Sequence, residues 1–473
     1  MQPVFTAIVV AVFVLGRAFA AGTDELPPTV RSVLELRELP PDTLSVYVED
    51  LGTGEPLLRW LDQAPRNPAS TIKLLTTLVA LDLLGPAYTW NTNIYALGDI
   101  DGDTLEGDLL IQGHGDPFLV TERVWQMLRR VRQTGLRVIT GDLLIDDSYF
   151  DVAAEDPAAF DRQPLRAYNV TPNALLMNFK VVRFWFEPDH GANAVRVRLD
   201  PPLTNVDLVN ELSLAAGRCR GYQRGITIST NAAIDKVTFS GKFPSGCKRY
   251  AMDRTALSHN EFAFGLFSLL WRESGGGFDG RLRNARTPDD AEPLVTFESL
   301  PLVDVIARVN KHSNNVMARQ LLYTLSAEQF GAPGTEAGGR KVISDWLMQN
   351  GLNFAELAFE NGAGRSRDVR ISARDLGAML AFAWRQTYMP EYVSSLALSG
   401  SDGTLRRRLD DQALVGRAHL KTGSLDDVAA IAGYLQSRSG RRFVVVVLQN
   451  HLDVHRGPGE EVQEALLRWL NRQ

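Results

Sequence analysis

The 473-residue sequence is poor in several features that mark specialised classes of protein. It has two cysteines, and two thiols without partner histidines cannot make a closed zinc site. Its formal net charge is -6 with acidic and basic residues mixed throughout, so it lacks the basic footprint of a nucleic-acid-binding protein. Beyond the N-terminus it has no apolar run long enough to span a bilayer. We therefore expect a soluble mature chain that binds no nucleic acid and associates with a membrane at most peripherally.

The N-terminal residues have the composition of an export signal. Residues 3–15 form an apolar run that is too short to cross a membrane, and the small-x-small sequence Ala18-Phe19-Ala20 follows. This pattern predicts a signal peptide over residues 1–20, with an N-terminal membrane anchor as the alternative. In an exported protein an isolated pair of cysteines most simply forms a disulfide, so we expect Cys219 and Cys247 to be bonded to each other.

The order of the predicted elements indicates one domain that a long insertion interrupts. Its first part, residues 21–88, contains a short helix, two strands and an apolar helix, at 29–37, 44–50, 56–61 and 68–84. Its second part, residues 292–473, contains helices at 299–309, 372–385 and 459–471 and strands at 417–422, 429–436 and 442–449. The five strands can form one antiparallel sheet with flanking helices, which is an α+β arrangement.

Residues 89–291 differ in composition and predicted secondary structure from the segments on either side. Short β-rich pieces are broken by Gly, Asp and Pro, and helical periods occur at 121–134 and 259–273. We predict that this segment forms smaller inserted accessory domains that carry the disulfide.

The apolar helix at 68–84 begins with a serine and a lysine three residues apart, Ser70 and Lys73. Nearly every face of this helix is apolar, so the helix and its lysine should be buried. Residues three apart lie on one helical face, which brings the amine next to the hydroxyl. Burial or a nearby second cation lowers the pKa of an amine, so the amine can accept a proton near neutral pH. Ser70 is therefore a candidate nucleophile, with Lys73 as its base.

A lone Ser-x-x-Lys pair is more often structural, because serine is a common N-cap and lysine can extend to solvent from a helix end. The chain repeats the pattern at Ser245-Gly246-Cys247-Lys248, where the glycine, the cysteine and a preceding proline indicate a turn. An apolar helix that would desolvate the amine follows Ser70 but does not follow Ser245.

A second polar motif, Ser313-Asn314-Asn315, lies in a short break between two predicted helices. Short polar side chains in such a connection can project into a cleft. The same Ser-x-Asn pattern at 229–231 and 258–260 does not have this position. Capping of the helix that begins at Val316 is the structural alternative.

A third motif, Lys421-Thr422-Gly423-Ser424, lies on a predicted strand. An edge strand can bind an extended peptide by main-chain pairing, and Gly423 would allow the ligand backbone to approach closely. Lys421 would supply the second cation beside Lys73 and attract a carboxylate. The structural alternative is a basic strand end that runs into a turn.

In this order, Ser-x-x-Lys, Ser-x-Asn and Lys-Thr-Gly resemble the motifs of the serine penicillin-binding proteins and β-lactamases. More narrowly, most of the mature chain resembles the low-molecular-mass class C penicillin-binding proteins, the D-alanyl-D-alanine carboxypeptidase/endopeptidase family (peptidase family S13). The narrower resemblance rests on the long insertion, the Lys421 tetrad and three further segments: Gly113-His114-Gly115-Asp116-Pro117, Asn361-Gly362-Ala363-Gly364-Arg365-Ser366-Arg367 and Asp402-Gly403-Thr404-Leu405-Arg406.

This resemblance implies a penicilloyl-serine transferase fold with nested accessory domains and a periplasmic location. It implies cleavage of terminal D-Ala-D-Ala bonds of peptidoglycan stem peptides, or of D-Ala-diaminopimelate crosslinks, through an acyl-serine intermediate that β-lactams also form, without a cofactor or metal. Ser70 would attack with Lys73 as base, and Ser313 would pass the proton to the leaving amine. The substrate-binding residues would be Asn315, Lys421, Thr422, Gly423 and Ser424.

The chain departs from the family pattern at three positions. The family usually has serine where Ala363 stands, leucine where Arg365 stands and often threonine at Ser424, and the first two bear on fine substrate preference. Three alternatives remain: a β-lactamase, a catalytically silent peptidoglycan-binding scaffold, and a hydrolase of the Ser-His-Asp type. For a hydrolase of the Ser-His-Asp type, the chain has seven histidines that could serve as the base, but it lacks the Gly-x-Ser-x-Gly motif.

Overall fold

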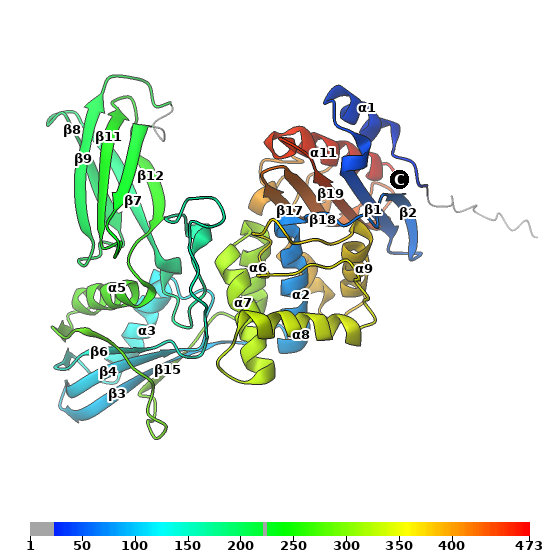
Figure 1. The fold of residues 1–473 in the computed structure, drawn as a ribbon. Coiled ribbons are helices and arrows are strands. Elements are labelled where there is room, and N and C mark those ends of the chain that lie inside the picture. The colour runs from blue at the N-terminus through cyan, green and yellow to red at the C-terminus, as the bar shows by residue number, and fades with distance from the viewer. Residues whose placement is uncertain (1–22, 221–224) are drawn as a thin grey trace, which may run out of the picture.

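The computed structural model describes residues 23–220 and 225–473, so the predicted signal peptide at 1–20 lies outside the described residues. The described chain is built on three β-sheets with helices between and around them (Figure 1). The first sheet combines strands from both ends of the chain, and the other two contain strands from the long middle segment. Within the described residues, no helix has the length and apolar character needed to cross a membrane.

The first sheet has six antiparallel strands in the order β16-β17-β18-β19-β1-β2. The bounds are β1 Leu44–Asp50, β2 Glu55–Trp60, β16 Ala397–Leu398, β17 Ala418–Leu425, β18 Val428–Gln436 and β19 Arg442–Asn450. Five of these are the predicted strands, and the prediction of five strands was wrong by one. The additional strand β16 is two residues long, so it has no alternating pattern that a sequence could reveal.

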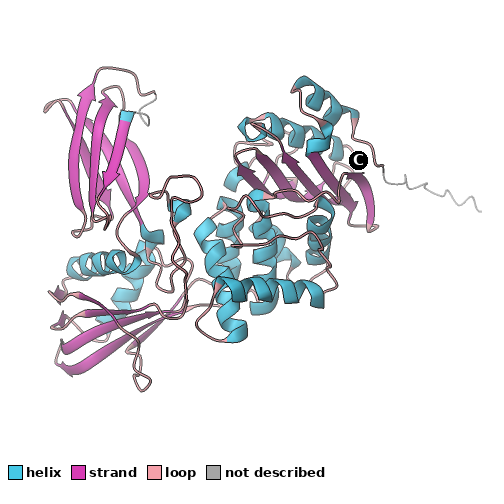
Figure 2. Ribbon diagram, in the orientation of Figure 1, coloured by secondary structure: helices cyan, strands magenta, loops and turns pink. Residues whose placement is uncertain are grey.

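Helices cover both faces of this sheet, as Figure 2 shows. On one face, α1 Pro28–Leu36 and α11 Pro458–Leu470 pack over a core that includes Val46, Ile431 and Val445. On the other face lie α2 Lys73–Leu84, α6 Leu302–His312, α7 Asn315–Phe330, α8 Glu336–Gln349, α9 Ala373–Trp384 and α10 Met389–Ser395. The amphipathic C-terminal helix therefore buries its apolar side against the sheet.

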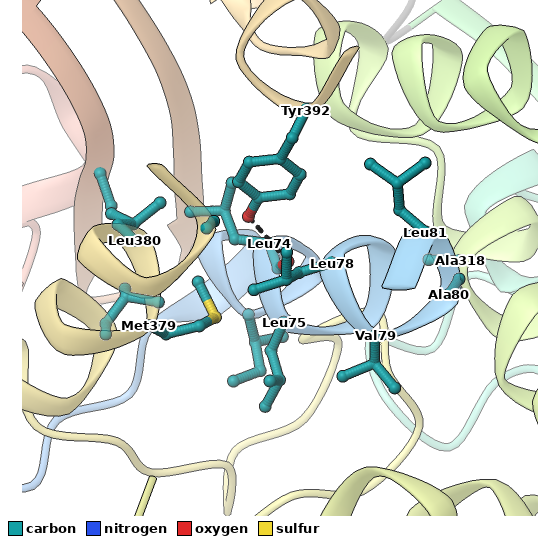
Figure 3. Packing of buried hydrophobic residues seen from close by; sticks show 14 of the residues in the cluster. Leu74, Leu75, Leu78, Val79, Ala80, Leu81, Ala318, Met379, Leu380 and Tyr392 are labelled. Atoms are coloured by element: carbon teal, nitrogen blue, oxygen red, sulfur yellow. Dashed lines mark hydrogen bonds between the residues drawn. The ribbon is translucent and has the colours of Figure 1, made fainter. Parts of the chain in front are cut away.

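Helix α2 is the centre of the larger core, as its apolar sequence predicts. Every residue from Lys73 to Leu81 is buried. Figure 3 shows that the leucine side chains of this helix project in several directions into a core that includes Met379, Leu380 and Tyr392. The Tyr392 hydroxyl donates a hydrogen bond to the carbonyl of Leu74 at 2.9 Å. The helix ends at Leu84 because Gly85 takes a positive φ of 81°, which terminates the helical hydrogen bonds.

The middle segment, together with residues 295–298, forms the other two sheets. One has β13-β5-β4-β3-β15 in order, with β6 and β14 beside them: β3 Asn91–Asp101, β4 Thr104–Gly113, β5 Val138–Ile139, β6 Leu143–Asp146, β13 Gly277–Phe278, β14 Leu282–Asn284 and β15 Val295–Glu298. The other has the order β10-β11-β9-β8-β7-β12: β7 Val181–Asp189, β8 Ala194–Asp200, β9 Asp207–Ala215, β10 Ile226–Thr230, β11 Lys236–Pro244 and β12 Tyr250–Thr255. The predicted domain division at 88/89 and 291/292 stays a prediction.

Helices α3 Thr121–Gln133 and α5 His259–Glu273 contribute to the core that these two sheets share (Figure 1). Both helices match the predicted periods at 121–134 and 259–273. Ser258 caps α5 with a complete capping box, so the Ser258 motif is structural. The predicted disulfide is present between Cys219 and Cys247. The second Ser-x-x-Lys pair, Ser245 and Lys248, lies in the turn and loop between β11 and β12.

One helix is displaced from its predicted position. The helix expected at 299–309 is α6, Leu302–His312, and Pro301 is its N-cap residue. Proline favours the start of a helix because its missing N–H is not needed there. The shift matters because it places the end of α6 directly before Ser313.

Candidate active site

Ser70 and Lys73 meet because the chain between them is a 3₁₀ turn. Residues Ala69–Ile72 form this turn and α2 begins at Lys73. In a 3₁₀ turn, side chains three residues apart are eclipsed, so the two functional groups stand one above the other. Lys73 Nζ donates a hydrogen bond to Ser70 Oγ at 2.8 Å. The predicted pairing of these residues therefore occurs, although in a tighter turn than the α-helix that we expected at this point.

Ser70 follows a residue with an unusual backbone conformation. Ala69 has a φ of 45°, a region that non-glycine residues adopt rarely and at a cost. Gly364 packs against this residue, because a Cβ on Gly364 would lie 2.0 Å from the Ala69 carbonyl oxygen. The glycine-rich segment 361–364 therefore buttresses the turn that presents Ser70.

The Lys73 side chain is fully buried, and polar groups surround its amine. Besides Ser70 Oγ, it donates to Asn315 Oδ1 at 2.7 Å and to the backbone carbonyl of Ala363. Because Ala363 contributes its carbonyl, the loss of the usual serine side chain leaves this contact intact. Burial, and secondarily the positive charge of Lys421, hold the pKa of Lys73 well below its usual range. A neutral amine at this position can accept the proton of Ser70.

Ser313 and Asn315 lie at the junction of two helices. Ser313 ends α6 in the left-handed conformation, with φ 57° and ψ 37°, and this sharp turn separates α6 from α7. Asn314 is the N-cap of α7, since its side chain accepts the Met317 N–H at 3.1 Å. The structural role that we considered for the motif thus belongs to Asn314, which leaves Ser313 and Asn315 free to face the cleft.

Strand β17 brings the third motif to the same place. Lys421 is fully buried and donates to Ser313 Oγ at 2.9 Å and to the carbonyl of Thr422 at 2.7 Å. Burial lowers the pKa of Lys421 to about 7. Lys73 therefore donates to the hydroxyl of Ser70, and Lys421 donates to the hydroxyl of Ser313.

Gly423 allows two parts of the chain itself to pack closely. A Cβ at this position would lie 2.5 Å from the carbonyl oxygen of Pro68 and 3.1 Å from the backbone nitrogen of Ser70. The glycine thus lets β17 lie directly against the serine turn, a reason that differs from the ligand approach we expected. Strand β16 pairs with Leu420 and His419, so the outer edge of β17 is unpaired from Lys421 onward within the described sheet.

A cavity of about 1290 Å³ opens over these residues. Ser70, Ser313, Asn315 and Ser424 line one side of it. The inserted segment supplies much of the opposite side, through residues that include Trp125, Phe160, Asp161, Tyr168 and Arg183. The sequence did not predict these insertion residues, because no motif marks them and they reach the site only through the tertiary fold.

Arg365, where the family usually has leucine, contacts this insertion wall. Its guanidinium lies 4.7 Å from the centre of the Phe160 ring, close enough for a cation–π contact, and it donates to the Tyr168 carbonyl at 3.5 Å. Asn315 Nδ2 reaches the same carbonyl at 3.5 Å. The loop around Tyr168 therefore contacts both Arg365 and Asn315 at the edge of the cleft.

The described contacts of Ser70 do not fit a Ser-His-Asp site. The hydrogen-bond partner of its hydroxyl is the Lys73 amine, whereas a triad requires an imidazole. One group of potential metal ligands occurs in the described part of the chain, Asp427, Asp453 and His455. The Nδ1 atom of His455 already accepts the Asp427 N–H at 2.8 Å, so this nitrogen is engaged in a loop contact.

A serine-lysine pair, a Ser-x-Asn turn and a Lys-Thr-Gly strand that converge on an antiparallel sheet define the site of a penicilloyl-serine transferase. Within that class, residues 28–473 match the D-Ala-D-Ala carboxypeptidase 3 (S13) family, and the chain belongs to this family. It is a serine-type D-alanyl-D-alanine carboxypeptidase.

Individual relatives agree with this assignment. A D-alanyl-D-alanine carboxypeptidase of Actinomadura sp. (strain R39) is 27% identical over 455 residues, which cover 92% of this chain and 83% of the relative. The structure of penicillin binding protein 4 from Haemophilus influenzae superposes with a TM-score of 0.80 at 20% identity, over 94% of this chain and 99% of the other. A predatory endopeptidase from Bdellovibrio bacteriovorus superposes more loosely, with a TM-score of 0.51 at 14% identity, over 90% of this chain and 92% of the other. These superpositions support the predicted fold class.

Proposed function

We propose that this enzyme removes the terminal D-alanine of peptidoglycan stem peptides and splits D-Ala-diaminopimelate crosslinks in the periplasm, and that β-lactams acylate it at Ser70. The observation that carries the proposal is the 2.8 Å contact between Ser70 Oγ and the buried Lys73 amine. The carboxypeptidase relatives support the first activity. The predatory endopeptidase structures have the same fold and support the cleavage of crosslinks. The structure of penicillin binding protein 4 with a β-lactam supports acylation by β-lactams.

The first step is attack of Ser70 Oγ on the D-alanyl carbonyl. Lys73 takes the serine proton as the bond forms, which its lowered pKa permits. In this mechanism the backbone N–H groups of Ser70 and Ser424 hold the developing oxyanion. The close packing of Gly423 against the serine turn supports this role. Asn315 holds the Lys73 amine in place and orients the substrate amide.

The leaving amine is protonated from the other side of the cleft. Ser313, which accepts a hydrogen bond from Lys421 Nζ, gives its proton to the departing amine and regains one from Lys73, which holds the proton taken from Ser70. Lys421, Thr422 and Ser424 hold the terminal carboxylate of the substrate, so that the scissile bond lies over Ser70. Water then releases the acyl group and restores Ser70.

The test is incubation of the purified enzyme with free and crosslinked muropeptides, followed by mass analysis. Loss of a terminal D-alanine supports the carboxypeptidase activity, and splitting of dimers supports the endopeptidase activity. Ser70→Ala is the control, and it should abolish both. Folded enzyme that forms a β-lactam adduct but leaves all muropeptides intact would contradict the proposed substrate, and rapid release of that adduct would indicate a β-lactamase.

A further inference from the structure

The hydroxyl of Thr422 has a protein partner outside the three motifs. It donates a hydrogen bond to the hydroxyl of Thr404 at 2.8 Å, and both side chains are half-buried. Thr404 belongs to the short 3₁₀ turn Gly403–Leu405, which lies beside β17. A single hydroxyl therefore connects a loop of the domain to the residue that we place at the substrate carboxylate.

The direction of this hydrogen bond has a consequence for binding. A hydroxyl has one proton to donate and two lone pairs that accept. A carboxylate requires the proton of Thr422, so Thr422 must then accept a hydrogen bond from Thr404 instead of donating one. The pair can make this change by rotation of the two hydroxyls. A donated bond from Thr404 also polarises the Thr422 hydroxyl and strengthens its bond to an anion.

The Thr404 turn is anchored by a salt bridge. Asp402 Oδ2 lies 2.6 Å from Lys311 Nζ, and Asp402 Oδ1 accepts the Leu398 N–H at 2.8 Å. Lys311 Nζ also donates to the carbonyl of Leu396 at 3.0 Å. Asp402 is thereby fixed from two directions, two residues before Thr404.

Backbone packing fixes the same turn at its first residue. Gly403 has a φ of 53°, and a Cβ there would lie 2.5 Å from the carbonyl oxygen of Lys311. The turn therefore lies directly on the last turn of α6. Since Lys311 is two residues before Ser313, one set of contacts holds Thr404 against both the Ser313 turn and β17.

We propose that Thr404 is a positioning residue for recognition of the substrate's terminal carboxylate, acting through the hydroxyl of Thr422 and held in place by Lys311 and Asp402. This inference rests on the proposed function, in which Thr422 binds that carboxylate. Thr404 is predicted to affect discrimination between substrates that have the carboxylate and substrates that lack it, without a role in acyl transfer itself.

The experiment compares two thioester substrates with the same N-acyl-D-alanyl group. One has a thioglycolate leaving group with a free carboxylate, and the other has the neutral thioglycolamide. Wild-type enzyme should have the higher kcat/KM for the carboxylate. Thr404→Val keeps the shape of the side chain but removes the hydroxyl, and it should lower this preference by roughly 2- to 10-fold through KM. Thr404→Ser retains the hydroxyl and should keep the wild-type preference.

The neutral substrate reports on folding and acyl transfer within the same experiment. An unchanged preference in Thr404→Val, or an equal loss on both substrates, would overturn the inference while leaving the proposed function intact. A wild-type enzyme that does not distinguish the two thioesters would instead show that the carboxylate is not recognised, and it would overturn both.

Discussion

Lys73 Nζ lies 2.8 Å from Ser70 Oγ and 2.7 Å from Asn315 Oδ1, so one buried amine connects the nucleophile to a residue that lies 242 positions after Lys73 in the chain. Lys73 has no described carboxylate partner, and burial, with a smaller contribution from the charge of Lys421, lowers its pKa. This arrangement favours the neutral amine, which is the form that can accept a proton.

The acylation rate is expected to have a bell-shaped dependence on pH. Lys73 must be neutral, so the rate should rise with pH through its lowered pKa. Lys421 must be charged to attract a carboxylate, so the rate should fall as pH rises through about 7, the value to which burial lowers its pKa. The measurement is the second-order rate constant for acylation by a penicillin from pH 4 to pH 10. A rate that rises steadily to pH 10 would contradict the assigned roles.

Asn315→Asp should impair the base without removing it. A carboxylate next to the amine favours the ammonium and raises the pKa of Lys73 by about 1–3 units. Acylation at neutral pH should fall, by at most roughly 1000-fold, and recover in part at higher pH. The neighbouring variant Asn314→Ala is the matched control: it removes the α7 cap and should cost about 1 kcal/mol of stability while leaving the pH profile unchanged. Identical pH profiles for Asn315→Asp and wild type would refute the contact's role.

Asp116→Asn should stabilise the protein at neutral pH. Asp116 is 3% exposed, and burial raises the pKa of its carboxyl to about 6. Because the folded-state pKa lies above the unfolded one, the native state binds more protons, and stability is lost as pH rises from about 4 to 6. Asparagine carries no charge and can still accept the Phe118 N–H. Its advantage should be near zero at pH 4 and reach at most about 3 kcal/mol above pH 7, measured as the free energy of unfolding. An advantage that is the same at both pH values would show that the charge of Asp116 carries no penalty.

The disulfide should stabilise the insertion without supporting catalysis. Cys219 and Cys247 are 28 residues apart in the chain, and closing such a loop is worth about 3.6 kcal/mol in the chain-entropy description. The double variant Cys219→Ala/Cys247→Ala should lower the free energy of unfolding by about that amount. Its rate of acylation by penicillin, measured below the unfolding transition, should match the wild type. A strong loss of acylation in the folded double variant would instead show that the disulfide supports catalysis.

Much of the structure around the first sheet could be predicted from the sequence because its signals are local. The apolar sequence of α2, the continuous apolar runs of β18 and β19 and the break between α6 and α7 each lie within one short segment. The three motifs are short as well, and the structure brings them together. The reason for glycine at position 423 could not be predicted in this way. The backbone that leaves no room for a Cβ there is the turn at Pro68 and Ser70, more than three hundred residues earlier.

The remaining parts of the site depend on contacts between distant segments. Phe160 and Tyr168 reach the cleft from the insertion, and no spacing or composition in their loop marks them as lining residues. The partner of Thr422, Thr404, likewise has no local signal of its contact. The sixth strand β16 is defined by pairing with β17 alone, since two residues cannot show a periodic pattern. These features follow from tertiary packing, which a single sequence does not display.

The central claim is that Ser70 is the residue that receives the acyl group. The most direct measurement is to incubate the folded enzyme with a penicillin, digest it and locate the adduct by mass spectrometry. The account predicts one penicilloyl group, on the peptide that contains Ser70, and no adduct in folded Ser70→Ala. An adduct on a different residue, or one that persists in Ser70→Ala, would contradict it.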